Sequence, residues 1–509
     1  MSEDPSDRNR KDSNAFIRDL SLASIAPFVK KVKGVALIPV ITKWVGAGAF
    51  GVWKQFSITS GFIAVLATVG TAQVVNRYLA PMERPERYSA HFFAIASFVL
   101  GVSLLFTAGL LAVPQFASVR IFGEDTSLVP LLFLAAYLPV LAFSNRLLTF
   151  LRSRRRFDIV APLAVVRDLG SIILVATLIL LWKEIEYAIG GLFLWEVGGM
   201  IATFELARRK ANLKIVSPDF SEAKKYFSFG VPLVLVTVGS RLAEFADRYV
   251  IVNTMGIEEV GIYSVAYAGG AIGVLFLKPI QRVLLPDFSV LVESGKRKKL
   301  ERRLRGVVKY FIASQFGILI ALIFLGEAAL LLVSNRSFLS GLAVLQIIPF
   351  GIMAYGLLQI GTQVLNAEES TRLVGLIWIC VGALNVITNL FAVPVFGLEG
   401  AAMATVLSYI MGAAACWVIL LRSYSLQFQW GIPLKILVSV AVTGILLFLC
   451  KKYTDLDLIY TLTVQGCIGS IVYVGVLLLS GFVDKKEKRL MRENLNPKMS
   501  NFLARIGIV

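Results

Sequence analysis

Charged side chains interrupt three of the long apolar stretches in this chain of 509 residues. The basic ones that lie deep in these stretches are Lys30, Lys31, Lys33, Arg241, Arg248, Lys278 and Arg282. Lysine and arginine donate charge-assisted hydrogen bonds to phosphate oxygens, so a group of them is suited to holding an anion. At the centre of a bilayer each would cost at least about 2.5 kcal/mol unless water or an anionic partner is close. These seven residues are therefore the candidate binding site.

Acidic residues accompany part of this group. Arg241 and Glu244 are three residues apart, and Glu244 and Arg248 are four apart, so they can pair on one face of a helix. A structural ion-pair network is as consistent with this spacing as a substrate site. Asp247 and Asp168 are further candidates for an ion pair or for ion coupling. The sequence predicts no metal site and no cofactor.

The elements that hold these residues are membrane-spanning helices. The chain is 57% apolar with a mean hydropathy of +0.75, and only 17% of its residues are charged, against about a quarter in soluble domains. Apolar runs of about 20 residues, enough to cross roughly 30 Å of hydrocarbon, fill most of the sequence. The alternating strands of a membrane barrel are absent. The sequence thus predicts an all-α polytopic membrane protein and excludes a soluble or single-span one.

Fourteen transmembrane helices are predicted, and the basic residues orient them. The predicted spans are 20–45, 54–80, 89–113, 127–150, 159–182, 187–207, 229–254, 263–290, 307–333, 342–366, 373–395, 400–421, 433–450 and 458–481. Segments on one side, which include both termini, carry 32 lysines and arginines, and those on the other carry 5. Because basic segments stay in the cytoplasm, both termini are predicted to be cytoplasmic, in a plasma membrane. No cleavable signal peptide is predicted.

The chain also repeats itself at an offset of 210 residues. The segment from Gly46 to Trp53 matches that from Gly256 to Tyr263, and 188–191 matches 398–401. One offset held across six spans predicts two pseudo-symmetric six-helix bundles related by an axis along the membrane normal. The predicted parts are a tail at 1–18, lobes at 19–207 and 229–421, a linker at 208–228, an appended helix pair at 433–481 and a tail at 482–509.

Several short motifs add a resemblance to a known family. In chain order they are the glycine-rich repeat segment, Gly230-Val-Pro232, Asp247-Arg248-Tyr249, Leu285-Pro286-Asp-Phe-Ser, and the segment from Phe396 to Thr405. Together, over roughly 19–481, they resemble the polysaccharide-transporter family, the O-antigen-type lipid-linked oligosaccharide flippases. That family belongs to the multidrug/oligosaccharidyl-lipid/polysaccharide exporter superfamily.

The resemblance implies a site and a cargo. In that family, spans 1, 2, 7 and 8 line a central cavity, so the candidate basic residues are expected to face it. A surplus of positive charge between walls of low dielectric attracts an anion. The expected cargo is a polyprenyl (pyro)phosphate-linked oligosaccharide, moved to the outer leaflet by alternating access. Membrane lipids and polysaccharide assembly enzymes are the expected partners, and nucleic acid is not.

Three details leave alternatives open. The first span can instead begin near Gly34, which would put Lys30, Lys31 and Lys33 at its mouth. A multidrug or toxin cation exporter of the same superfamily is the alternative function, but it would need carboxylates in the cavity, and basic residues outnumber acidic ones in spans 1, 7 and 8. A membrane enzyme is a further alternative. The longest connection on the basic-poor side, 114–126, is short for glycan chemistry, so no enzymatic activity is predicted.

Overall fold

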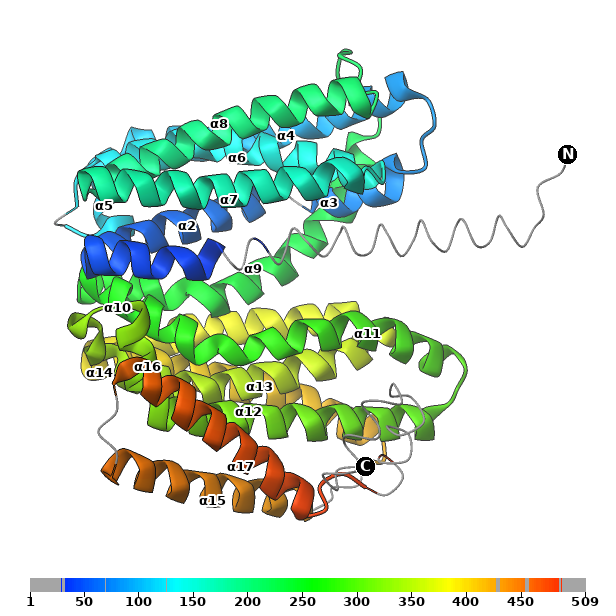
Figure 1. Ribbon diagram of the computed structural model, residues 1–509. Coiled ribbons are helices and arrows are strands. Elements are labelled where there is room, and N and C mark those ends of the chain that lie inside the picture. The colour runs from blue at the N-terminus through cyan, green and yellow to red at the C-terminus, as the bar shows by residue number, and fades with distance from the viewer. Residues whose placement is uncertain are drawn as a thin grey trace, which may run out of the picture. The chain divides into compact units, whose positions relative to one another are not determined.

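The computed structural model describes residues 33–484, with gaps at 69, 125, 427–430 and 454–456, together with Val29 and Glu487. Throughout this part of the chain the regular secondary structure is helical (Figure 1). Eleven of the described helices are long and apolar enough to cross a membrane. The prediction of an all-α, multi-pass membrane protein is therefore confirmed, while the count of fourteen spans stays a prediction.

The chain divides into two compact units. The first consists of Met1–Val265, Val333–Ser337 and Trp378–Ala404, and the second of Ala266–Leu332, Phe338–Ile377 and Thr405–Val509. The predicted lobes at 19–207 and 229–421, and their pseudo-symmetry, stay predictions.

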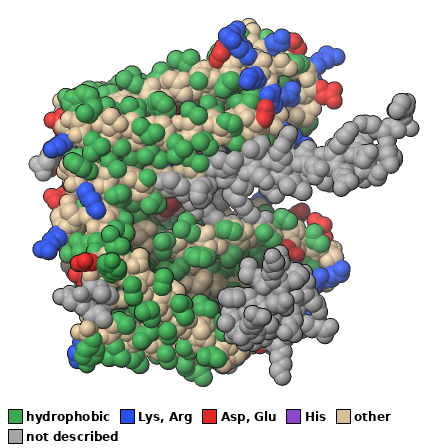
Figure 2. Space-filling model, in the orientation of Figure 1, with side chains coloured by type: hydrophobic (Ala, Val, Ile, Leu, Met, Phe, Trp, Pro, Cys, Tyr) green, Lys and Arg blue, Asp and Glu red, His purple; other side chains and the backbone are tan. Residues whose placement is uncertain are grey.

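Helices of the first unit lie side by side. They are a helix at 33–44, α2 (Ala47–Thr68), α3 (Thr71–Val74), η1 (Val75–Leu79), α4 (Pro85–Ala112), α5 (Pro114–Phe122), α6 (Val129–Ser153), α7 (Phe157–Trp182), α8 (Ile185–Lys210), α9 (Ala223–Thr254) and most of α10 (Ile257–Gly270). Helix α6 packs on both α4 and α8, and α8 also packs on α7 (Figure 1). On the face shown in Figure 2, hydrophobic side chains cover the flank of these helices and charged ones gather at the helix ends. This distribution suits helices surrounded by lipid.

The second unit holds most of the remaining helices. They are η2 (Ala271–Gly273), α11 (Val274–Glu293), α12 (Arg297–Val333), η3 (Arg336–Gly341), α13 (Leu342–Ala367), α14 (Thr371–Ser423), α15 (Gly431–Tyr453), α16 (Leu458–Tyr460), η4 (Thr461–Gln465) and α17 (Gly466–Leu479). Helix α14 covers two predicted spans and bends at Gly397, whose φ of 59° interrupts the helical backbone. Its middle part, Trp378–Ala404, belongs to the first unit.

The connection between α8 and α9 lies against the start of α4. The backbone N–H of Lys214 donates to Ser89 Oγ at 3.0 Å, and that of Asp219 donates to the Ala90 carbonyl oxygen at 3.1 Å. His91 is only 1% exposed, with its Nε2 3.7 Å from Asp219 Oδ2. The predicted linker thus packs on the first unit.

Glycines at the matched positions of the repeat begin two helices. Gly46 and Gly256 have φ values of 111° and 100°, a region that only glycine adopts freely, and α2 and α10 start directly after them. Helix α2 therefore begins at Ala47, seven residues before the predicted start of the second span. Apolar content alone does not reveal this helix start, because a glycine-rich segment is also typical of a loop.

The next matched glycines, Gly51 and Gly261, bring the backbones of α2 and α10 into contact. A Cβ atom on Gly51 would lie closer than 3.0 Å to the carbonyl oxygen of Ile257, and one on Gly261 would lie equally close to that of Ala47. The contact is reciprocal, since Ile257 follows Ala47 by the same 210 residues that separate the two glycines. Small residues permit such close helix packing in membranes.

The appended helices are attached to α12 by two polar contacts in the second unit. The Tyr473 hydroxyl on α17 donates to the Ala313 carbonyl oxygen at 2.7 Å. Beyond α17, Glu487 accepts a hydrogen bond of 2.7 Å from the ammonium of Lys309, a side chain that is 7% exposed. Lys309 also lies 4.8 Å from the ring centroid of Phe482. These contacts position the end of α17 on α12.

Substituting Gly261 tests the contact between α2 and α10. In Gly261→Ala the new methyl group meets backbone atoms that cannot rotate away, so the free energy of unfolding should fall by about 1–3 kcal/mol, as overpacked substitutions do. Thermal unfolding of the purified protein in detergent measures this change. Gly48→Ala is the matched control, because its Cβ atom would have no neighbour within 4 Å. Equal melting temperatures for the two variants would contradict the contact.

The Lys309–Glu487 pair should respond to pH. Burial opposes ionisation of Glu487, but hydrogen bonds from Lys309 and the Asp484 backbone outweigh it and hold the pKa below its ordinary value of 4.5. The pair thus stabilises the folded state above that ordinary pKa, and this contribution is lost as the pH falls through the lowered one. Protection of amides at the end of α17 from hydrogen exchange, corrected for the intrinsic pH dependence of the exchange rate, should decrease over that range, and Glu487→Gln should abolish this pH dependence of protection. An unchanged pH dependence in Glu487→Gln would rule out this role.

Candidate functional site

A buried ion pair forms the centre of the charged cluster on α9. Arg248 Nη1 donates to both carboxylate oxygens of Asp247, at 2.7 and 2.9 Å, and the two side chains are 2% and 1% exposed. The Tyr263 hydroxyl on α10 donates to Asp247 Oδ2 at 2.7 Å. Arg248 also donates to the backbone carbonyl oxygen of Glu244 at 2.7 Å. Arg248 is therefore held within the first unit by several partners at once.

One turn earlier on α9, a second pair is open to its surroundings. Arg241 Nη1 donates to Glu244 Oε2 at 2.9 Å, and these side chains are 39% and 45% exposed. This pairing of residues three apart agrees with the predicted spacing. The predicted partner of Arg248, the Glu244 carboxylate, is replaced by Asp247, because the Glu244 side chain is bonded to Arg241. Arg241 thus presents a guanidinium that an outside ligand can reach.

Helix α2 adds a lysine to this cluster. Lys54 interacts electrostatically with Arg248, Glu244 and Asp247. The predicted second span, 54–80, begins at this lysine. Since α2 begins at Ala47, Lys54 instead lies two turns inside the helix. With three basic and two acidic side chains, the cluster carries a formal surplus of one positive charge.

A separate network connects α6, α7 and α8. Arg167 on α7 is paired with the buried Glu196 on α8, and its Nη2 also donates to Ser144 Oγ on α6 at 2.9 Å. Its neighbour Asp168 lies 4.0 Å from Lys33 Nζ instead. Asp168, predicted as a candidate for an ion pair, thus has its partner on another helix. Successive helical residues point about 100° apart, so the two face different neighbours.

The remaining candidates are not brought together by the described part of the structure. Lys30 and Lys31 lie outside the described residues. Lys278 and Arg282 belong to α11, one turn apart, and their side chains also lie outside the description. Of the seven predicted basic residues, Arg241 and Arg248 share the cluster on α9, while Lys33 lies beside Asp168. A single site formed by all seven stays a prediction.

Sequence reasoning missed one basic residue inside the helices. Arg146 on α6 is 4% exposed, and its Nη1 donates to Thr71 Oγ1 at 2.6 Å. Its Nε atom has no hydrogen-bond partner among the described residues. The signal was its position within the predicted span at 127–150, four residues before its end. Among the residues that the structure describes, no three histidine, cysteine, aspartate or glutamate side chains are grouped to hold a metal ion.

Long apolar helices with paired internal charges define a polytopic membrane protein of the transporter type. Residues 17–292, more than half of the chain, match the family described as polysaccharide biosynthesis protein, and the chain belongs to that family. The resemblance inferred from the sequence motifs is confirmed.

Relatives extend the match along most of the chain. The probable low-salt glycan biosynthesis flippase Agl15 of Haloferax volcanii is 23% identical over 91% of this chain and 96% of its own length. Stage V sporulation protein B of Bacillus subtilis is 23% identical over 93% of this chain and 97% of its own. These relatives span nearly the same length as this protein.

Solved structures share the fold. The lipid II flippase MurJ, in an inward closed conformation, matches 90% of this chain and 98% of its own with a TM-score of 0.70 and 17% identity. An inward-facing multidrug resistance MATE transporter matches 79% of this chain and 96% of its own, with a TM-score of 0.58 and 15% identity. The arrangement of helices is therefore common to both kinds of transporter.

Neutralising the two acids on α9 separates a structural ion pair from an open one. Asp247→Asn leaves Arg248 buried without its counter-charge, and breaking such a pair costs about 3–5 kcal/mol. Glu244→Gln is the matched control on the same helix, where loss of an exposed pair costs about 1 kcal/mol or less. Thermal unfolding should show a much larger decrease for Asp247→Asn. Equal decreases would refute the distinction.

Proposed function

We propose that this protein is a flippase that moves a polyprenyl phosphate- or pyrophosphate-linked oligosaccharide from the cytoplasmic to the outer leaflet. Membership of the polysaccharide biosynthesis family supports the class of cargo, as do relatives named as flippases. The observation that carries the proposal is the surplus of basic over acidic side chains within the apolar helices. A cationic surplus there selects an anionic ligand, and the phosphate is the anionic part of such a lipid.

The proposed place of each part of the cargo follows from the chemistry of that part. Lys30, Lys31, Lys33, Arg241, Arg248, Lys278 and Arg282 form the proposed cationic cavity. The phosphate would bind there through charge-assisted hydrogen bonds, the glycan would occupy the aqueous space, and the apolar lipid would stay in the bilayer. The chain acts as a transporter in this proposal and carries out no covalent step.

The two pairs on α9 suggest different roles for their arginines. A phosphate with more than one anionic oxygen can compete with the single carboxylate of Glu244 for the exposed guanidinium of Arg241. Arg248 is buried, is paired with Asp247 and has its guanidinium carbon 5.0 Å from the ring centroid of Tyr263. We therefore assign Arg241 to phosphate binding and Arg248 to maintaining the shape and potential of the site.

Alternating access would move the bound phosphate between the two sides of the membrane. The proposed motion is a rocking of the two predicted lobes, the motion expected of repeat-built transporters. The distribution of 32 and 5 basic residues supports cytoplasmic termini in a plasma membrane. Enzymes that assemble the glycan at the cytoplasmic face would supply the cargo.

A multidrug or toxin cation exporter is the second candidate, favoured by the fold that this chain shares with MATE transporters. Such a protein needs exposed carboxylates without basic partners to hold a cation. In the cluster on α9, both carboxylates are instead paired with arginines. The sign of the surplus charge therefore favours the flippase.

Transport in proteoliposomes tests the proposal. Lys31→Ala, Arg241→Ala and Lys278→Ala should each reduce flipping of a fluorescent lipid-linked oligosaccharide by roughly ten- to a hundredfold, as expected for losing a charged hydrogen bond. Lys225→Ala is the control, because this lysine is exposed and its described contacts are with Glu222, three residues away, and the ring of Tyr78. Unchanged flipping in all three variants would exclude the cationic site. Export of cationic dyes would favour the second candidate.

A further inference from the structure

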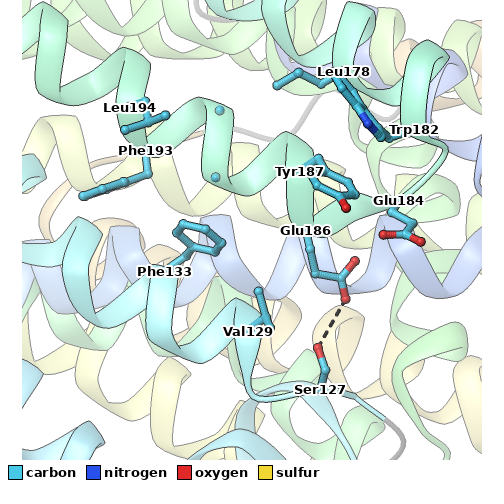
Figure 3. A pocket seen from close by; sticks show the side chains of 12 residues that line it. Ser127, Val129, Phe133, Leu178, Trp182, Glu184, Glu186, Tyr187, Phe193 and Leu194 are labelled. Atoms are coloured by element: carbon cyan, nitrogen blue, oxygen red, sulfur yellow. Dashed lines mark hydrogen bonds between the residues drawn. The ribbon is translucent and has the colours of Figure 1, made fainter.

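An apolar groove runs between α6, α7 and α8 on the first unit (Figure 3). Its volume is about 710 Å³. Aromatic and aliphatic side chains provide most of its lining: Phe133, Leu178, Trp182, Tyr187, Phe193 and Leu194. Leu194 and Trp182 are 68% and 50% exposed, so the groove opens to the surroundings of the helices. In a membrane those surroundings are lipid.

Two glycines of α8 give the groove its depth. A Cβ atom on Gly190 would lie 2.9 Å from Phe133 Cζ, and one on Gly191 would lie closer than 3.0 Å to Leu178 Cδ1. Side chains from α6 and α7 thus lie directly against the backbone of α8. A larger residue at Gly191 would have to displace Leu178 or project into the groove.

A polar cavity of about 550 Å³ adjoins one end of this groove. The two share Ser127, Glu184 and Glu186, and Lys183 and Glu258 line only the polar part. At the boundary, the Ser127 hydroxyl donates to Glu186 Oε1 at 3.3 Å (Figure 3). The continuous surface therefore changes from apolar to charged within the length of one turn of α8.

The boundary lies at the level expected of a membrane surface. Glu184 and Glu186 mark the start of α8, and Lys183 ends α7 in the left-handed conformation with a φ of 56°. Trp182 and Tyr187, at the mouth of the groove, are the residue types that favour the boundary between hydrocarbon and headgroups. This end of the helices carries few basic residues, so the charge asymmetry assigns it to the outer leaflet.

We propose that this surface binds a phospholipid with a zwitterionic, primary-amine headgroup. One acyl chain would lie in the aromatic groove, held by van der Waals packing against its side chains, since transfer from surrounding lipid gains little. The ammonium group would bind Glu184 and Glu186, and the phosphate would bind Lys183. Lipids with a net negative headgroup are disfavoured, because three glutamates face a single lysine.

The charge of this surface separates it from the proposed transport site. A lipid-linked oligosaccharide presents one or two phosphates without an amine next to them, and three carboxylates repel such a group. The cluster on α9 has the opposite surplus. The lipid site therefore goes beyond the proposed transport function and depends only on the placement of α6, α7 and α8 in a membrane.

Fluorescence quenching of Trp182 tests the proposal in the full-length protein. Proteoliposomes would contain a small, equal fraction of brominated-chain phosphatidylethanolamine, phosphatidylcholine or phosphatidylglycerol. The difference between the native protein and Trp182→Phe isolates the signal of this tryptophan. Phosphatidylethanolamine should quench most strongly, since only its ammonium donates hydrogen bonds to the carboxylates. Equal quenching by all three lipids would show that the groove does not select a headgroup, and this result would overturn the proposal.

Charge variants identify the groups responsible. Glu184→Gln combined with Glu186→Gln should reduce the preference for phosphatidylethanolamine by roughly two- to fivefold, the range of partly solvated ion pairs. Glu124→Gln, an exposed glutamate outside both cavities, should leave it unchanged. Asparagine tolerates the left-handed backbone conformation at position 183. Lys183→Asn should therefore reduce the preference for phosphatidylethanolamine over phosphatidylcholine less than the double variant does. A preference that survives in the double variant would refute the assigned contacts.

Filling the groove provides an independent readout. Gly191→Leu should reduce quenching of Trp182 by every brominated lipid, because the acyl chain loses its place. Undiminished quenching in Gly191→Leu would show that no chain occupies the groove. None of these measurements uses transport, so their failure would leave the proposed flippase function unaffected.

Discussion

A charged group inside a bundle of apolar helices has to be neutralised by a partner, and the first unit is organised around that requirement. Asp247 and Arg248 are almost completely buried and are bonded to each other, with Tyr263 from α10 as a third member. Because removing one partner would leave a charge in a medium of low dielectric, this group constrains how α9 and α10 pack. The same requirement pairs Arg167 with Glu196 across α7 and α8.

A buried charged side chain whose partner neutralises it has a structural role. A charged side chain in an exposed ion pair remains available to bind a ligand. Arg241 and Glu244 meet the second description, and Lys54 adds a positive charge from α2. The surface at Lys183, Glu184 and Glu186 has the opposite balance. The two proposed sites of this chain thus have opposite sign, a cationic one suited to a phosphate and an acidic one suited to an amine.

Glycines determine how closely the backbones approach. The reciprocal contact of Gly51 and Gly261 joins α2 and α10 through backbone atoms, and Gly190 and Gly191 admit side chains of α6 and α7 against α8. In a membrane, helices gain little from burying apolar surface against one another, so contacts of this kind contribute much of the packing energy. The first contact also explains why both matched positions of the repeat, Gly51 and Gly261, are glycine.

Composition and motif order were enough to predict an all-α membrane protein, its family and the spacing of the Arg241–Glu244 pair. Hydropathy and the spacing of residues along one helix depend only on the local sequence, so both can be predicted from it. The partners of Arg248, Arg167 and Asp168, the position of Lys54 and the lipid-facing groove were decided by tertiary structure. Each depends on how far one helix is rotated about its axis relative to the next. A rotation of about 100°, the step between adjacent residues, exchanges one partner for another without any change in sequence.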